Sequence, residues 1–243
     1  MYSFNERIRY SELGENGELS LLGLLNLFQD CSTFQSEDLG LGIEYLKGKK
    51  EAWWVNSWQI DIIKLPVLAD NVEVGTFAYD FKSFYGYRNF YLKDAKGDFL
   101  VKADSIWFHY DLDNKRPTKP TAQALEKYLA GNEQRFDMTK IVRKFEIPTE
   151  YELGSEIIVS KNDLDTNHHM NNAIYVSKAK NIIKEDFKVK KISVQYKRAA
   201  VLDDVILPRI TKGKDFYIVN LADTDGDTYA IVRFLWNWEK YRA

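Results

Sequence analysis

The chain has 243 residues, of which 45% are hydrophobic, 14% aromatic and 29% charged, a composition typical of globular proteins that excludes disorder as the main state. The 34 Lys and Arg residues nearly balance the 36 Asp and Glu residues, which leaves a net charge of −2. This balance provides no overall attraction to nucleic acid or anionic lipid, so we expect neither as a partner.

No apolar segment approaches the ~18 residues that cross a bilayer, and Met1–Arg7 lacks the apolar core of a signal peptide. We therefore expect no membrane span. The single cysteine, Cys31, cannot form an internal disulfide, and no histidine lies beside it. We expect a buried packing residue and not a reactive thiol. A lone cysteine suits a reducing compartment, which favours a cytoplasmic protein.

The first half begins with a predicted helix around Leu21–Phe28, which is apolar on nearly every side and should be buried under a sheet. Residues 40–51 contain Gly-Leu-Gly and Lys-Gly-Lys-Lys and are predicted to form a loop. A hairpin then joins Phe90–Lys93 to Phe99–Val101 through Lys96-Gly97-Asp98. A long strand bearing Trp107 follows.

Between the halves, Arg116–Thr121 leads into a short amphipathic helix with Ala122, Leu125 and Leu129, which Gly131 ends. The polar segment 132–144 is predicted to be a linker. We expect three parts, namely a first half over residues 1–130, a linker over 131–150 and a second half over 151–243.

The second half repeats this order of elements. A helix is predicted from Ala173 to Ile183, and a hairpin joins Tyr217–Val219 to Tyr229–Val232 through Asp225-Gly226-Asp227. A strand bearing Trp236 is expected to extend to Asn237.

The halves align in blocks, as an internal repeat requires. Leu13 matches Leu164 (164 − 13 = 151), Asp70 matches Asp203 (203 − 70 = 133), and Gly97 matches Gly226 (226 − 97 = 129). Each half then has a strand, a loop, one long helix and about four antiparallel strands. The sequence predicts an α+β protein with a tandem double hotdog, in which each half is a long buried helix wrapped by an antiparallel β-sheet.

Two of the three histidines fall in the polar segment Asp163–Asn172, just before the second helix. Asp165, Asn167 and His169 occupy alternate positions and can project to one side of an extended loop. An aspartate can accept a proton, a histidine can exchange protons near neutral pH, and an asparagine can donate to an oxyanion. Such a set suits the attack of water on a carbonyl.

Other interpretations of this segment are weaker. Asn171 or Asn172 is expected to cap the following helix, a role compatible with catalysis. The spacing of Asp163, Asp165 and Asn167 also matches the first three ligand positions of a calcium-binding EF-hand loop. However, His168 and Ile174 stand where such a loop requires Gly and Glu. His109 lies in the other half without a ligand partner at a recognisable spacing. We expect no metal and no cofactor.

The segment from Asp163 to Tyr175 resembles the Asp-x-Asn-x-His-x-Asn-Asn signature of the acyl-acyl carrier protein (acyl-ACP) thioesterases of plants and bacteria. The resemblance extends over almost the whole chain, including Leu27–Gly40 and Arg88–Trp107. It implies a tandem double hotdog that hydrolyses the thioester between a fatty acyl chain and the phosphopantetheine arm of acyl carrier protein. The implied catalytic residues are Asp165, Asn167 and His169, and the phosphopantetheine belongs to the substrate.

The sequence departs from the family after Tyr196-Lys197-Arg198. Many members carry a glutamate at the next position, and plant members then have a cysteine, but this chain has Ala199 and Ala200. A cysteine nucleophile therefore cannot operate here. Two alternatives stay open: an acyl-CoA thioesterase of the same fold, and a non-catalytic protein that binds acyl chains or acyl-ACP.

In the first half, the repeat places Gly14, Asn16 and Glu18 at the positions of Asp165, Asn167 and His169, and Pro66 at the position of Ala199. We therefore predict one active site, in the second half, with the first half lining the acyl pocket. Because acyl carrier protein is acidic, basic residues near the site are candidates for docking it, namely Lys188, Lys190, Lys191, Lys197 and Arg198, with Lys140 and Lys144 in the linker. The sequence leaves a homodimer open.

Overall fold

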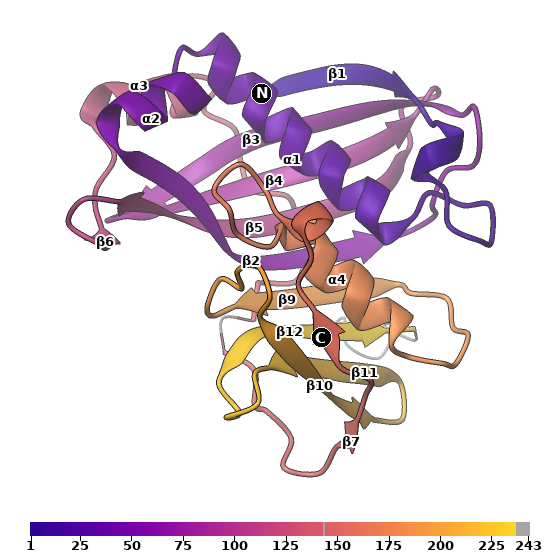
Figure 1. Cartoon of the computed structure of the whole chain (residues 1–243). Coiled ribbons are helices and arrows are strands. Elements are labelled where there is room, and N and C mark those ends of the chain that lie inside the picture. The colour runs from indigo at the N-terminus through magenta and orange to yellow at the C-terminus, as the bar shows by residue number, and fades with distance from the viewer. Residues whose placement is uncertain (143, 237–243) are drawn as a thin grey trace. The chain divides into compact units, whose positions relative to one another are not determined.

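The computed structural model describes residues 1–142 and 144–236. It contains two compact units, the first made of Met1–Asn56 and Ile62–Lys140, the second of Ser57–Asp61 and the residues from Ile141 onward. In each unit one long helix lies against an antiparallel sheet (Figure 1). This arrangement confirms the predicted α+β class.

The first unit contains two α-helices besides the long one, and its strands follow the order β1-β3-β4-β5-β2 in the sheet. Its elements are β1 (Tyr2–Arg7), the 3-10 helix η1 (Tyr10–Glu12), α1 (Leu21–Asp38), α2 (Ile43–Lys49), β2 (Glu51–Ile62), β3 (Asn71–Lys82), β4 (Tyr85–Asp94), β5 (Phe99–Asp111), β6 (Arg116–Pro117) and α3 (Ala122–Leu129).

The helix α1 confirms the buried helix expected around Leu21–Phe28 and extends ten residues beyond it, to Asp38. Ser20 caps its start, because the Oγ atom accepts a hydrogen bond from the Gly23 N–H at 3.0 Å. Cys31 is fully buried on this helix, with Sγ 3.6 Å from the Val74 carbonyl oxygen. The cysteine is therefore a packing residue, as predicted.

The loop predicted at residues 40–51 is wrong, because most of this segment forms α2. The Glu37 carboxylate accepts the Ile43 N–H at 2.8 Å and so satisfies a backbone donor at the helix start. Lys50, in the left-handed conformation with φ of 54°, ends the helix. The glycine and lysine content of the segment concealed a helix whose start depends on a residue from α1.

Part of the segment predicted to be a linker packs on the first unit. Arg135 Nε donates to Asp104 Oδ2 at 2.9 Å, and the Phe136 N–H donates to Asn89 Oδ1 at 2.8 Å. The Phe136 ring lies 5.1 Å from that of Phe77. Asp104 is 2% exposed, and burial raises its pKa although Arg135 opposes the shift. Residues 135 and 136 are thus fixed to the sheet by a buried ion pair and an aromatic contact.

In the second unit the strands follow the order β9-β12-β11-β10-β7, and the end of β2, Ser57–Asp61, pairs with β9. Its other elements are β7 (Glu152–Leu153), β8 (Ile157–Ile158), the 3-10 helix η2 (Lys161–Asp163), α4 (Asn172–Asn181), β9 (Lys191–Tyr196), β10 (Val205–Lys212), β11 (Phe216–Ala222) and β12 (Thr228–Leu235).

Both predicted hairpins are confirmed, one by β4 and β5 and the other by β11 and β12. Gly97 and Gly226 occupy their turns with φ of 88° and 97°, a conformation that favours glycine. The strand expected to extend to Asn237 is described to Leu235, and Asn237 lies outside the described residues. Over the described ranges, no helix is long and apolar enough to cross a membrane.

Gly75 in β3 lies under the ring of Tyr91, and a Cβ atom at this position would come within 2.0 Å of the ring. Because Tyr91 is 2% exposed and cannot move freely, we expect Gly75→Ala to lower the free energy of unfolding by about 1–3 kcal/mol. Gly48 in α2 is the matched control, since a Cβ there meets no atom within 4 Å.

Gly48→Ala should leave stability unchanged or raise it by about 0.5–1 kcal/mol, because alanine favours helix. Urea unfolding of both variants checks the prediction. Equal stability of the two variants would show that the Tyr91 ring does not restrict position 75.

Candidate active site

The segment that carries the predicted site residues is a tight loop between η2 and α4. The Asp165 N–H donates to the His169 carbonyl at 2.7 Å, and the His168 N–H donates to the Asp165 carbonyl at 3.0 Å. The loop is tied to a second segment, because the Met170 N–H donates to the Ala200 carbonyl at 2.8 Å. The backbone thus fixes Asp165 and His169 close together.

The Asp165 carboxylate stabilises this loop. Its Oδ1 atom accepts the backbone N–H of Asn167 at 2.8 Å and that of His169 at 3.3 Å. Aspartate side chains commonly accept such bonds from residues shortly after them and thereby close turns. Within the described residues Oδ2 has no hydrogen-bond partner, so one carboxylate oxygen serves the fold and the other is available.

The expectation of an extended loop is wrong in its geometry. His168 has φ of 60°, in the left-handed region, and the two bonds to Asp165 Oδ1 fold the chain into a turn. Asp165 and His169 are half-buried, whereas Asn167 is exposed. The structure therefore brings the three residues together on one turn, but not by strand-like alternation.

Asn171 caps α4, which confirms one of the two expected asparagine caps. Its Oδ1 atom accepts the Ala173 N–H at 2.8 Å. The helix start therefore directly follows the loop, and its backbone dipoles place partial positive charge beside it.

The first unit contains a loop with the same backbone hydrogen bonds. The Gly14 N–H donates to the Glu18 carbonyl at 2.9 Å, and the Leu19 N–H donates to the Pro66 carbonyl at 2.8 Å. Gly17, with φ of 76°, stands where the second unit has His168. These bonds confirm the predicted offset of 151 between the two loops (165 − 14 = 151).

The two loops differ in their side chains. Gly14 has no carboxylate, and here Asn16 Oδ1 accepts the Glu18 N–H at 3.2 Å. The first loop is therefore closed without an aspartate, and it has a glutamate where the second has His169. The turn itself does not require the acid, amide and imidazole set.

The predicted offset of 133 for the next block is wrong by one residue. The Val67 N–H donates to Asp70 Oδ2 at 3.0 Å, and the Val201 N–H donates to Asp204 Oδ2 at 2.9 Å. Asp70 therefore matches Asp204 (204 − 70 = 134). Sequence alignment matched Asp70 to the first of two adjacent aspartates, whereas the second one closes the turn. Pro66 accordingly matches Ala200 and not Ala199.

This alignment reveals a pair of residues that the sequence interpretation missed. The Ala200 N–H donates to the Tyr175 hydroxyl at 2.7 Å, and Tyr175 is 2% exposed. Burial raises the pKa of Tyr175, so its hydroxyl stays protonated. The first unit has Leu24 and Pro66 at the two positions, and proline has no N–H to satisfy. The sequence contained a signal for this pair, because the two halves differ at both positions: the second half has Tyr175 and Ala200, whereas the first half has Leu24 and Pro66.

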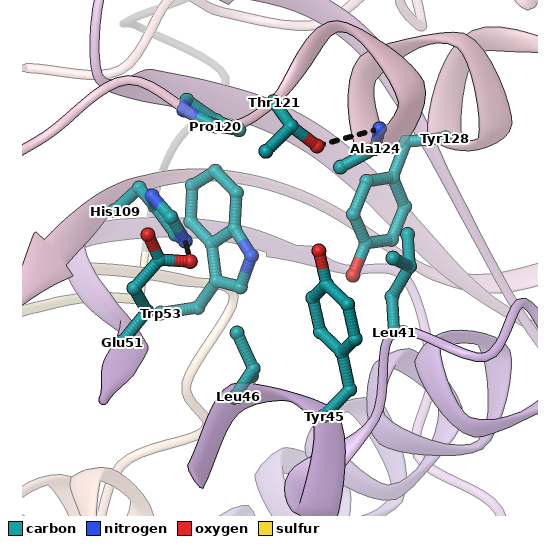
Figure 2. Close-up of a pocket in the computed structure, with 10 residues that line it drawn as sticks. All are labelled: Leu41, Tyr45, Leu46, Glu51, Trp53, His109, Pro120, Thr121, Ala124 and Tyr128. Atoms are coloured by element: carbon teal, nitrogen blue, oxygen red, sulfur yellow. Dashed lines mark hydrogen bonds and ion pairs between the residues drawn. The ribbon is translucent and has the colours of Figure 1, made fainter. Parts of the chain in front are cut away.

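A hollow in the first unit contains none of the predicted site residues (Figure 2). His109 lies in its wall, with the ring 4.7 Å from that of Trp53 and Nε2 3.5 Å from Glu51 Oε2. Burial lowers the pKa of His109, and the Glu51 carboxylate opposes this shift. Its partner is therefore a carboxylate from a neighbouring strand, which spacing along the chain could not identify.

Comparison with known proteins places both units in one family. The model of the acyl-ACP thioesterase N-terminal domain matches residues 1–128, and that of the C-terminal domain matches residues 147–238. The chain is 25% identical to oleoyl-acyl carrier protein thioesterase 2 of Arabidopsis thaliana, over 93% of this chain and 68% of that protein.

Solved structures show the same fold. An acyl-ACP thioesterase from Bacteroides thetaiotaomicron superimposes with a TM-score of 0.87 at 16% identity, covering 97% of each chain. The 12:0-ACP thioesterase from Umbellularia californica gives 0.80 at 20% identity, covering 97% of this chain and 96% of that one. These likenesses confirm the predicted tandem double hotdog.

A double-mutant cycle tests the hydrogen bond between the Ala200 N–H and the Tyr175 hydroxyl. Tyr175→Phe leaves the buried Ala200 N–H without an acceptor and should lower the free energy of unfolding by about 1–3 kcal/mol. Ala200→Pro removes that N–H, as Pro66 does in the first unit. In the Tyr175→Phe background it should therefore cost much less than in the wild type.

Urea unfolding of the wild type, both single variants and the double variant measures the coupling. Tyr10→Phe is the control, since Tyr10 is 82% exposed and should lose nothing. Additive losses would show that the hydroxyl and the N–H do not depend on each other.

Proposed function

The chain belongs to the acyl-ACP thioesterase family, and we propose that it hydrolyses fatty acyl-acyl carrier protein at the loop of Asp165, Asn167 and His169. One observation carries the assignment of the site. Two loops share the same backbone, but only the second unit's loop combines a carboxylate, an amide and an imidazole. Such a set matches what the hydrolysis of a thioester requires.

The roles follow from the positions of the atoms. Asp165 Oδ2 is available to accept a hydrogen bond from a water molecule, while Oδ1 holds the turn. As the water oxygen bonds to the thioester carbonyl carbon, its proton passes to the Asp165 and His169 pair. The Asn167 side chain and the start of α4 stabilise the oxyanion that forms. Collapse breaks the carbon–sulfur bond, and the leaving sulfur takes up the proton that the Asp165 and His169 pair received from the water.

Ala199 and Ala200 add no side-chain acid or nucleophile to this reaction. Ala199 is exposed, and Ala200 contributes its carbonyl to Met170 and its N–H to Tyr175. Of the two carboxylates in the same segment, Asp204 accepts the Val201 N–H at 2.9 Å and so serves its own turn, and Asp203 is exposed. Activation of water therefore rests on Asp165 and His169.

The proposed substrate brings its own prosthetic arm, so the proposal includes no cofactor and no metal. Acyl carrier protein is the proposed partner, and a homodimer stays a prediction. The buried free thiol of Cys31 supports the cytoplasm as the proposed compartment.

One predicted docking residue is corrected. Lys191 is 6% exposed and lies 3.4 Å from the Asp61 carboxylate, so it cannot meet a partner protein. Arg198 is paired with Asp223 Oδ2 at 2.5 Å. Lys188 and Lys197 are exposed, as are Lys140 and Lys144 in the linker segment, and these four stay in the proposal as docking residues.

The experiment distinguishes a loss of catalysis from a loss of loop structure. Asp165→Asn keeps an oxygen that can accept the two backbone N–H groups but cannot take a proton. We expect thiol release from acyl-ACP to fall by a factor of about 10² to 10⁴, with the melting temperature near that of the wild type. His169→Ala should cause a loss of similar size. His168→Asn is the control, because His168 is exposed and asparagine tolerates its positive φ.

The outcomes discriminate the alternatives. Faster release from acyl-CoA than from acyl-ACP in the wild type would favour an acyl-CoA thioesterase. Tight binding of acyl-ACP without any thiol release would identify a binding protein. Full activity of Asp165→Asn would remove Asp165 from the catalytic set.

A further inference from the structure

Arg88 in β4 is a buried cation without a carboxylate partner. The residue is 8% exposed, and its Nη1 atom donates to Gln35 Oε1 on α1 and to Thr76 Oγ1 on β3, the latter at 3.1 Å. Its guanidinium carbon lies 5.9 Å from the centre of the Phe90 ring and 5.5 Å from that of Tyr128. Within the described residues it forms no ion pair.

In the described part of the chain, the hydrogen bonds of the guanidinium involve one of its three nitrogen atoms. The two bonds occupy Nη1, whereas Nε and Nη2 have no partner among the described residues. Nε and Nη2 present parallel N–H groups, the arrangement that holds a carboxylate through two hydrogen bonds. The contacts with Gln35 and Thr76 fix this fork in place before any ligand arrives.

The surroundings do not neutralise the charge. The ionisable groups that affect Arg88 are Tyr128 and Cys31, and burial lowers the pKa of Arg88 itself. Burial raises the pKa of Cys31 to about 12 and also raises that of Tyr128, so both neighbours are neutral at physiological pH. Arginine stays protonated in proteins, and a buried charge without a partner is costly.

The second unit shows that the fold does not need this cluster. The turns that follow Asp94 and Asp223 match at an offset of 129 (223 − 94), which places Tyr217 at the position of Arg88. The offset of 134 places Ile210 at the position of Thr76 (210 − 76). An antiparallel sheet under a helix thus forms in the same chain without a buried arginine.

We propose that Arg88 is a carboxylate-binding subsite in the core of the first unit and that it takes the carboxylate of an aliphatic chain. The apolar surroundings support an aliphatic ligand, since Phe28 on α1 lies 5.3 Å from Phe90, and Cys31 is fully buried. The carboxylate is either the far end of a dicarboxylic acyl chain or that of the released fatty acid. The choice between these two carboxylates rests on the proposed function, whereas the proposal of a carboxylate-binding subsite rests only on the burial and hydrogen bonds of Arg88.

The first experiment measures binding without turnover. Calorimetric titration compares octanoate with 1-octanol, which lacks the carboxylate, on the full chain. The wild type should bind octanoate at least tenfold more tightly than octanol. Arg88→Met should abolish this preference, and Arg88→Lys should reduce it because lysine has a charge but no planar fork. Lys96→Met, at an exposed hairpin turn, should preserve it.

Equal binding of octanoate and octanol by the wild type would overturn the subsite, as would an unchanged preference in Arg88→Met or Arg88→Lys. Circular dichroism verifies that each variant is folded. If Arg88→Met does not fold, the wild type and Arg88→Lys still decide the question.

The second experiment identifies the source of the carboxylate. Faster thiol release from an ω-carboxyacyl thioester than from the unmodified acyl thioester, lost in Arg88→Met, identifies the end of the substrate chain. Inhibition by octanoate that weakens in Arg88→Met identifies the product. Equal rates without inhibition would remove Arg88 from the reaction. Absence of any thiol release from the wild type would refute the proposed hydrolysis and leave the octanoate comparison intact.

Discussion

The hydrogen bond between the Met170 N–H and the Ala200 carbonyl, 2.8 Å long, holds the candidate catalytic loop against the segment before β10. Its counterpart in the first unit joins Leu19 to Pro66 over the same distance. Both loops also close on themselves and then run directly into a capped helix. The backbone of the hotdog unit therefore provides a preformed turn at the start of its helix, and the side chains on that turn determine whether it carries chemistry.

Asp165 shows how closely structure and proposed chemistry are linked. One carboxylate oxygen closes the turn through the N–H groups of Asn167 and His169, and the other is unpaired within the described residues. The first unit closes the same turn with Asn16 and no carboxylate. Arg88 distinguishes the units in the opposite sense, since this buried arginine lies in the first unit and Tyr217 takes its place in the second. The two units share a backbone plan and differ in their polar side chains.

The sequence was most informative where a short local pattern determines the structure. The apolar residues around Leu24 predicted a buried helix, and Gly97 and Gly226 predicted hairpins, because only the immediate neighbours matter there. The helix α2 was missed because its start depends on Glu37, a contact that no periodicity shows. Lys191 looked like a surface lysine, but strand pairing buries it beside Asp61. The role of Tyr175 as acceptor for the Ala200 N–H could be recognised only after Ala200 was matched correctly to Pro66.

The central claim is that the two turns share one backbone and that the side chains of the second carry the reaction. The most direct measurement is thiol release from acyl-ACP in two reciprocal variants. Gly14→Asp/Glu18→His places the second unit's acid and imidazole on the first turn, where a Cβ atom at position 14 would meet Asn16 Oδ1 at 3.2 Å. Asp165→Gly/His169→Glu makes the reverse change. We predict loss of turnover in the second variant and turnover at or above the wild-type level in the first, with both folded. Retained activity in the second variant would contradict the central claim.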